Sequence, residues 1–249
     1  MNAAFAALVF APSLAVGSFL NVVASRLPVG RSVVKPRSAC PSCGAEIRPR
    51  DNIPVVSWLL LRGRCRDCKA PISWRYPAVE LGTALLAAAC FLAFGVTLQA
   101  LAGAIFCAAL VVITATDIER RIVPNRVVLP ATVIVLALNL AWHPSLEWPL
   151  AGLGAAFFLF VAALVYPAGM GMGDVKLALL LGVAVGRAVP VAMMVGMISA
   201  LVPSLVLFAR YGKAARKMGI PFAPFLALGG VIALFWGADV VNWYLNLGH

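Results

Sequence analysis

Long apolar runs separated by short polar segments organise this chain. They cover about residues 3–23, 78–94, 98–116, 127–142, 150–166, 175–185 and 190–208, and a last run ends near residue 244. Most of these runs are close in length to the ~20 residues that a helix needs to cross a bilayer. The pattern therefore predicts an all-α polytopic membrane protein with about eight transmembrane helices.

The composition supports a membrane protein and the charge pattern predicts its orientation. Hydrophobic residues make up 63% of the 249 residues and charged residues 12%, whereas soluble domains have about 45–50% and about 25%. The net charge is +11, and the basic residues concentrate in segments 26–75 and 210–217. Because Lys and Arg are held in cytoplasmic loops, we expect both segments in the cytoplasm, both termini outside, and no nucleic-acid partner.

Residues 26–77 form a polar insert with two Cys-x-x-Cys pairs, Cys40 with Cys43 and Cys65 with Cys68. Two such pairs can complete the tetrahedral coordination of one zinc ion. The alternative is two disulfides or redox pairs, but cytoplasmic thiols are kept reduced. We therefore predict a small zinc-ribbon-like cytoplasmic insert between the first and second helices, in which a structural zinc ion supplies folding free energy.

Two aspartates lie at the ends of apolar runs. Asp117 follows the run 98–116, and Asp174 lies in Gly171-Met172-Gly173-Asp174-Val175-Lys176, just before the run 175–185. Alternating spans bring both to the cytoplasmic face. A close carboxylate pair shares one proton, so that one member activates water and the other polarises a scissile carbonyl. The alternative is that each aspartate caps or ends its own helix.

Other polar or small residues could support such a site. Gly171 and Gly173 lack a Cβ and would let an extended substrate backbone approach. Lys176 could reach lipid phosphates or hold Asp174 by its charge. Asn21 could form a helix–helix hydrogen bond or a substrate contact. Glu80, expected in the first turn of the second helix, favours the helix dipole or is a third polar group of the site.

Two other functional classes fit the sequence less well. A proton-coupled transporter could use Asp117, Asp174 and Glu80 as a relay, but transporter carboxylates lie nearer the bilayer midplane, often within repeats. A non-enzymatic scaffold would leave the glycine–aspartate segment unexplained. The sequence has no His-Glu-x-x-His helix and no Gly-x-Ser-x-Gly elbow, so zincin and serine-hydrolase chemistry are disfavoured.

The chain resembles the type IV prepilin peptidases, which are intramembrane aspartyl proteases of the Gly-x-Gly-Asp class. The resemblance runs nearly end to end. The matching segments are Gly17-Ser18-Phe19-Leu20-Asn21 with Arg26-Leu27-Pro28, both cysteine pairs, Arg75-Tyr76-Pro77 with Glu80, Asp117 with Pro124-Asn125, the segment Gly171-Met172-Gly173-Asp174-Val175-Lys176, and Ile220-Pro221-Phe222-Ala223-Pro224-Phe225. At Asn125 many relatives carry an acid.

The resemblance implies an activity and a location. The family cuts the short basic leader from type IV prepilins and type II secretion pseudopilins at the cytoplasmic face of the bacterial inner membrane. Members with the cysteine insert also methylate the new N-terminal amine with S-adenosylmethionine. It implies that Asp117 and Asp174 are catalytic and that the four cysteines bind zinc. It assigns no residue to the methyl donor.

The resemblance also implies a domain division and raises one electrostatic question. The expected division is a first transmembrane helix over 1–25, the tetracysteine insert over 26–77 and the protease domain over 78–249. A basic insert would repel a basic leader peptide. We expect that membrane lipid, if anionic, or one of the acids Glu46, Asp51, Asp67 and Glu80 offsets this repulsion.

Overall fold

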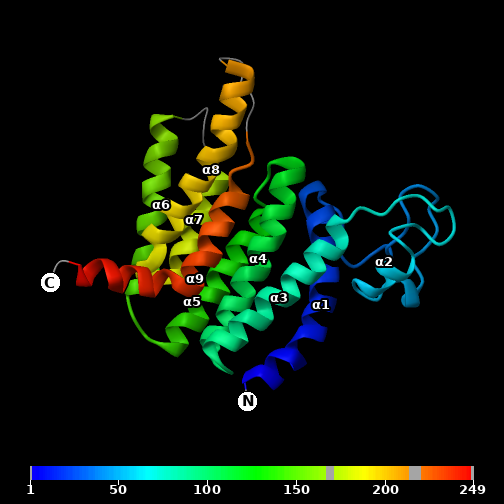
Figure 1. The fold of residues 1–249 in the computed structure, drawn as a ribbon, viewed down its shortest axis with the longest axis horizontal. Helices are drawn as coiled ribbons and strands as arrows, with labels where there is room; N and C mark the ends of the chain where they lie inside the picture. Colours follow the sequence, from blue (N-terminus) through cyan, green and yellow to red (C-terminus); the bar gives the residue numbers. More distant parts are fainter. Residues whose placement is uncertain (1, 167–170, 213–219, 248–249) are drawn as a thin grey trace. The chain divides into compact units, whose positions relative to one another are not determined.

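The computed structural model describes residues 2–166, 171–212 and 220–247 of the chain. By contacts it divides into two compact units, Met1–Val96 and Thr97–His249, which run from blue to cyan and from green to red in Figure 1. Each unit is described by itself. This division rests on compactness, whereas the predicted domains 1–25, 26–77 and 78–249 rest on function, so that division stays a prediction.

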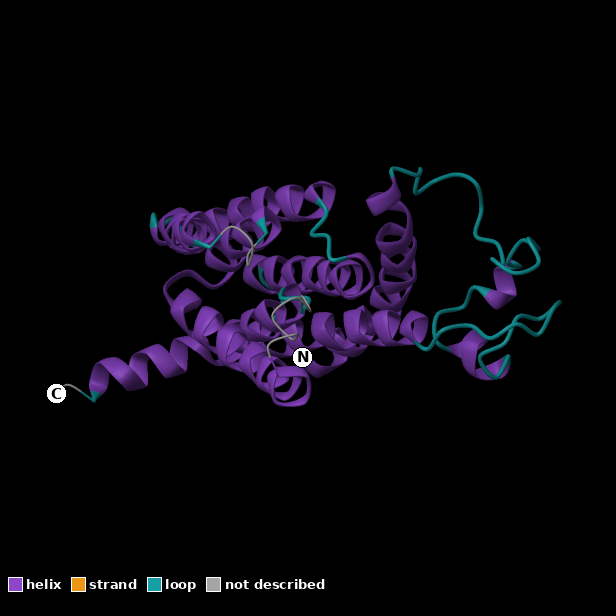
Figure 2. Ribbon diagram, turned by 90° about the horizontal axis from the view of Figure 1, so that it is seen from above, coloured by secondary structure: helices purple, strands orange, loops and turns teal. Residues whose placement is uncertain are grey.

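The described residues form helices and loops, without a β-strand among them (Figure 2). The all-α prediction is therefore confirmed. The first unit holds α1 (Asn2–Arg26), η1 (Leu27–Val29), η2 (Pro49–Asp51), α2 (Val56–Leu60) and α3 (Arg75–Phe94). The second holds α4 (Leu98–Arg120), α5 (Asn125–Trp142), α6 (Glu147–Val165), α7 (Met172–Val185), η3 (Gly186–Ala188), α8 (Val189–Tyr211) and α9 (Ala223–Asn246).

Seven helical stretches within the described ranges are long and apolar enough to cross a membrane. One of them, Met172–Tyr211, contains both α7 and α8. The short turn η3 separates the two helices, beginning at Gly186 with a φ of 55° that favours glycine. Dividing this stretch at η3 recovers the predicted eight helices.

Small residues allow the helices of the second unit to pack closely. A Cβ at Gly182 of α7 would overlap the backbone of Ala151 in α6, and one at Gly229 of α9 would overlap the carbonyl of Ala192 in α8. Such contacts are typical of membrane helices, which have no hydrophobic driving force for association and rely on close packing. They place α7 against α6 and α9 against α8.

Hydrogen bonds define the two ends of the second unit. The Lys176 Nζ donates to the Asn125 Oδ1 at the start of α7 and α5, and the Asn139 Nδ2 donates to the Val183 carbonyl near their ends. The helices α5 and α7 therefore run parallel. The same end that holds the starts of α5 and α7 also holds the end of α4, because Arg121 and Asn125 are joined by a short connection.

Two helices at this end, α4 and α7, extend beyond their apolar runs. The apolar runs 98–116 and 127–142 leave residues 117–126 as a connecting segment, but α4 continues to Arg120, and the N–H of Arg121 donates to the Asp117 carbonyl over 2.8 Å. Likewise α7 begins at Met172, where we expected residue 175. Backbone hydrogen bonding continues past the last apolar residue, so both aspartates lie within terminal helical turns.

Candidate active site and metal centre

Asp117 lies in the last turn of α4 and is buried, with 6% of its surface exposed. Its Oδ2 accepts a hydrogen bond of 3.1 Å from the N–H of Ala223, the first residue of α9. The first N–H groups of a helix have no partner within that helix. Asp117 therefore satisfies one of these donors, and the start of α9 fixes the position of its carboxylate.

Asp174 lies in the first turn of α7. Its Oδ2 accepts a hydrogen bond of 3.3 Å from the N–H of Gly171, and its own N–H donates to the Gly171 carbonyl over 3.0 Å. This reciprocal pair closes the start of the helix, where the dipole interacts favourably with a carboxylate. Both aspartates thus bind a backbone N–H at a helix N-terminus.

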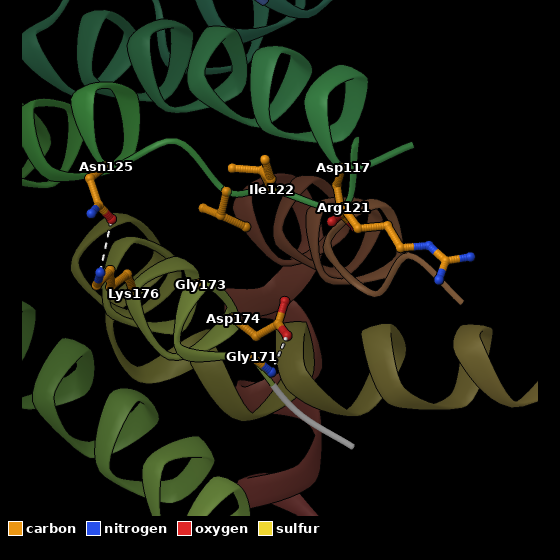
Figure 3. Close-up of a pocket in the computed structure, with 9 residues that line it drawn as sticks. Asp117, Arg121, Ile122, Asn125, Gly171, Gly173, Asp174 and Lys176 are labelled. Carbon is orange, nitrogen blue, oxygen red and sulfur yellow. Dashed lines mark hydrogen bonds between the residues drawn. The ribbon is translucent and has the colours of Figure 1, made fainter. Parts of the chain in front are cut away.

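The two aspartates line one open pocket of about 310 Å³. Figure 3 shows them on opposite walls, on α4 and α7, with an oxygen of each directed toward the space between them. The remaining lining residues come from the α4–α5 connection and the start of α7: Arg121, Ile122, Val123, Asn125, Gly171, Gly173 and Lys176. The pocket therefore brings two carboxylates from different helices to one opening.

The two glycines have different surroundings. A Cβ on Gly173 would lie 2.9 Å from the Val123 Cβ, which is closer than real Cβ contacts. A Cβ on Gly171 would meet its nearest atom at 3.7 Å, in ordinary van der Waals contact. Gly173 is therefore required for α7 to pack on the α4–α5 connection. Close approach of a substrate backbone remains possible at Gly171, which is exposed.

Lys176 ties two helices together. Its Nζ donates to the Asn125 Oδ1 over 2.9 Å (Figure 3). In the described part of the chain Lys176 forms no ion pair with Asp174, so holding Asp174 by charge is not what the structure shows. The Arg121 side chain extends away from Asp174 in Figure 3. The two carboxylates therefore face each other without a cation between them among the described residues.

Asn21 and Glu80 lie in the first unit, where α1 and α3 cross. The Asn21 Nδ2 donates to the Tyr76 carbonyl over 3.0 Å, so the expected helix–helix hydrogen bond is present. A Cβ on Gly17 would overlap the Glu80 backbone. Glu80 itself is buried and accepts a hydrogen bond of 2.7 Å from the Val55 N–H.

Glu80 is not in the first turn of its helix as we expected. The helix α3 begins at Arg75 and includes Pro77 in its first turn, where a proline N–H is not needed. Glu80 therefore lies in the second turn, too far along for the dipole explanation. Its buried carboxylate instead holds the backbone of the insert. Participation of Asn21 or Glu80 in the aspartate site stays a prediction.

The four predicted metal ligands lie together. The Sγ atoms of Cys40, Cys43, Cys65 and Cys68 are all within 4.8 Å of one another, and none is in a disulfide. The two Cys-x-x-Cys turns have the same hydrogen bonds: the N–H groups of Gly44 and Lys69 donate to the carbonyls of Cys40 and Cys65. Four sulfur ligands in this arrangement fit a tetrahedral zinc ion.

The thiols of this cluster differ in acidity. Backbone N–H groups of Cys43 and Ser42 lower the pKa of the Cys40 thiol to about 6. At Cys68 the backbone N–H of Ala70 lowers the pKa, but desolvation and the neighbouring thiols outweigh it and raise the pKa to about 11. Adjacent thiolates repel one another unless a cation is bound. The cluster is therefore suited to a metal ion, which would allow all four to ionise.

The acids of the insert are bound by arginines. Arg66 forms a two-point hydrogen-bonded pair with Asp51 at 2.6 and 2.8 Å and lowers the pKa of that carboxyl. Arg48 pairs with Asp67 at 3.4 Å. The remaining pair, Arg37 with Glu46, is longer at 3.9 Å. Asp51 and the buried Glu80 are therefore held within the insert, whereas Glu46 and Asp67 lie in exposed and longer pairs, and the role of these acids toward a basic leader stays a prediction.

Sequence reasoning missed part of the site. The Ala223 N–H, the Val123 side chain, Arg121 and Ile122 were not predicted to be near the aspartates. Ala223 offered one signal, because it lies among prolines that start α9, and a helix start supplies unpaired N–H groups. For Val123 the sequence offers no local signal, since its contact with Gly173 depends on the packing of the helices.

Comparisons with known proteins agree with this site. A family model described as "Bacterial Peptidase A24 N-terminal domain" matches residues 12–94, and one described as "Type IV leader peptidase family" matches residues 104–238. A protein of Bacillus subtilis is 33% identical over 96% of this chain and 98% of its own length. One of Pseudomonas aeruginosa is 38% identical, over 94% and 91% respectively.

Both relatives carry the name prepilin leader peptidase/N-methyltransferase. So does a protein of Burkholderia pseudomallei that is 36% identical over the whole of this chain and 89% of its own length. No solved structure gives a significant match.

Proposed function

Because the chain belongs to the type IV leader peptidase family, we propose that Asp117 and Asp174 form the acid–base pair that cuts a prepilin leader. Prepilin cleavage and N-methylation are the activities that the family and the relatives support, and the transporter alternative finds no support among them. The observation that carries the proposal is the pocket that both aspartates line from two different helices.

The chemistry follows from the position of the two carboxylates. With one proton between them, the ionised member takes a proton from water and the protonated member donates a hydrogen bond to the scissile carbonyl. The water oxygen bonds to the carbonyl carbon, and proton return to the amide nitrogen releases the leader. The N–H groups of Ala223 and Gly171 keep the carboxylates in place during these transfers.

The substrates and location are proposed in finer terms. Pseudopilins of type II secretion share the leader that the family cuts, so we include them as substrates. The chain is a multi-pass protein of the inner membrane, and we place the aspartate pocket on its cytoplasmic face with both termini outside. The basic segments 26–75 and 210–217 support this orientation through the positive-inside rule.

Two groups would complete the enzyme. Zinc, held by Cys40, Cys43, Cys65 and Cys68, would fix the fold of the insert. S-adenosylmethionine would supply the methyl group for the new N-terminal amine. The described residues present no pattern that assigns its binding site, so we assign it none.

The test is a single incubation. Purified protein is mixed with a prepilin and S-adenosylmethionine, and the products are weighed by mass spectrometry. We expect a released leader and a mature chain that carries one added methyl group on its new N-terminal amine. A prepilin of unchanged mass would refute the proposal, and a cut but unmethylated chain would refute only the second activity.

A further inference from the structure

The short helix α2 in the cysteine insert presents an uncovered apolar face. Val56, Leu59 and Leu60 are spaced three and four residues apart, which places them on one side of the helix. Leu59 is 61% exposed and Leu60 77% exposed. The intervening Trp58 points the other way: its Nε1 donates to the Ile72 carbonyl over 3.1 Å, and its ring covers Gly63.

The backbone just before α2 is bound to a side chain near the start of α3, which is a candidate membrane span. Glu80 accepts the Val55 N–H over 2.7 Å, directly before α2 begins. Glu80 is five residues past Arg75, where the candidate span Arg75–Phe94 starts, and that is about 7.5 Å along a helix axis. Amphipathic helices at membrane surfaces lie about 5–10 Å into the boundary between headgroups and acyl chains. Glu80 therefore anchors the start of α2 beside the second turn of this candidate span, which is where such a surface helix would lie.

Cations follow the apolar face directly. Arg62 and Arg64 come just after α2, and Lys69 lies in the second cysteine turn; all three are exposed. Within residues 27–74, all of which the structure describes, these three form no ion pair, and the acids Glu46, Asp51 and Asp67 contact other arginines. The charge that remains beside α2 is therefore positive and available to an anion.

We propose that α2 and the arginines after it are a docking surface for anionic phospholipid of the bilayer that the chain itself spans. Val56, Leu59 and Leu60 enter the boundary between headgroups and acyl chains, and Arg62 and Arg64 bind the lipid phosphates. The docked surface holds the cysteine cluster against the membrane. This inference rests on the first unit alone and does not depend on the proposed peptidase activity.

The test measures hydrogen–deuterium exchange of peptides covering residues 56–64 in the full-length protein. The protein is placed in nanodiscs of phosphatidylcholine, in nanodiscs that also contain phosphatidylglycerol, and in phosphatidylcholine nanodiscs with soluble glycerol phosphate. We expect exchange to slow by about tenfold or more with phosphatidylglycerol, because basic residues near an anionic surface bind it. Soluble glycerol phosphate should have no effect.

Paired variants separate the two parts of the surface. Arg62→Gln/Arg64→Gln should remove the difference between the two lipids, and Leu59→Asn/Leu60→Asn should speed exchange in both. Arg187→Gln, an exposed arginine of the second unit, is the control for lost charge and should change neither. Equal exchange of the unaltered protein in both nanodiscs, or slowing by soluble glycerol phosphate alone, would overturn the proposal.

Photo-crosslinking at Leu60 gives a second readout that does not require the arginine and leucine variants to fold like the parent protein. Benzoylphenylalanine in place of Leu60 in the full-length protein is photoactivated in the mixed nanodiscs, and adducts are identified by mass. We expect a phosphatidylglycerol adduct. Intact protein without any lipid adduct would show that α2 faces water and would overturn the proposal.

Discussion

The Asp117 Oδ2 accepts a hydrogen bond of 3.1 Å from the N–H of Ala223, although 106 residues separate them. The bond joins the end of α4 to the start of α9 and is buried. It explains how a carboxylate at the edge of a membrane helix can be held in one orientation. Because this contact needs only a hydrogen-bond acceptor whereas the proposed chemistry needs a carboxylate, a substitution at Asp117 can abolish cleavage and leave the fold intact.

The stability of an Asp117 variant should therefore depend on whether the new side chain accepts a hydrogen bond from the Ala223 N–H. Asp117→Asn keeps an oxygen for the Ala223 N–H and should fold almost normally. Asp117→Leu leaves that donor buried without a partner, which costs about 1–3 kcal/mol. Thermal unfolding in detergent would compare the two variants, and equal midpoints would contradict a structural role for this bond.

The glycines should differ in their tolerance of alanine. Gly173→Ala places a Cβ 2.9 Å from the Val123 Cβ, and overpacking of this kind costs about 1–3 kcal/mol. We expect cleavage to fall by about tenfold or more, because α7 moves away from the α4–α5 connection. Peptide cleavage rates of purified variants provide the measurement.

Matched variants identify the cause of that loss. Gly171→Ala is the control and should retain most activity, since its Cβ would have ordinary contacts. Val123→Gly removes the obstructing side chain, so Gly173→Ala/Val123→Gly should recover activity relative to Gly173→Ala. Without recovery, helix flexibility rather than the contact with Val123 would explain the requirement for glycine.

The bond between Lys176 and Asn125 should be replaceable by an ion pair. The Nζ and the Oδ1 are 2.9 Å apart, so Asn125→Asp keeps the acceptor and adds a charge. We expect that variant to retain cleavage, whereas Lys176→Met should lower it by about two- to tenfold, because a hydrogen bond to a charged group contributes about 1.5–3 kcal/mol and exposure reduces this. A Lys176→Met enzyme with unchanged rates would exclude a positioning role for the bond.

Loss of the metal should affect the insert more than the peptide cut. Cys40→Ser removes one of four sulfur ligands and should lower the zinc content of the purified protein. We expect weaker methyl transfer and lower stability, with cleavage reduced less, because the aspartate pocket is built from residues of the second unit alone. Metal analysis beside product masses tests this, and a metal-free parent protein that is fully folded would contradict it.

Local patterns made much of this architecture predictable. Apolar runs long enough to cross a bilayer have few alternatives to a helix, so eight helices could be counted from the sequence. The cysteine spacing predicted that Cys40, Cys43, Cys65 and Cys68 come together. Alternating spans predicted that Asp117 and Asp174 lie at the same end, and the shared pocket confirms this.

The remaining features depend on contacts between distant residues. The Asp117–Ala223 bond and the Gly173–Val123 contact require helices to be packed, which no local signal specifies. The prediction that Glu80 lies in the first turn of its helix was wrong because α3 begins at Arg75, before Pro77, which places Glu80 in the second turn. The acids of the insert could not be assigned in advance, since their arginine partners lie 9 to 19 residues away in loops: Arg37 with Glu46, Asp51 with Arg66, and Arg48 with Asp67.

The most direct test of the central claim is the rate at which Asp117→Asn and Asp174→Asn cut a prepilin peptide, each measured by mass spectrometry on protein with an unaltered thermal midpoint. Both changes keep a hydrogen-bond acceptor for the helix start but remove the carboxylate. We expect each to lower the rate by about 10²–10⁴-fold, as loss of an acid–base group does. Cleavage by either variant at the rate of the parent protein would contradict a shared aspartate mechanism.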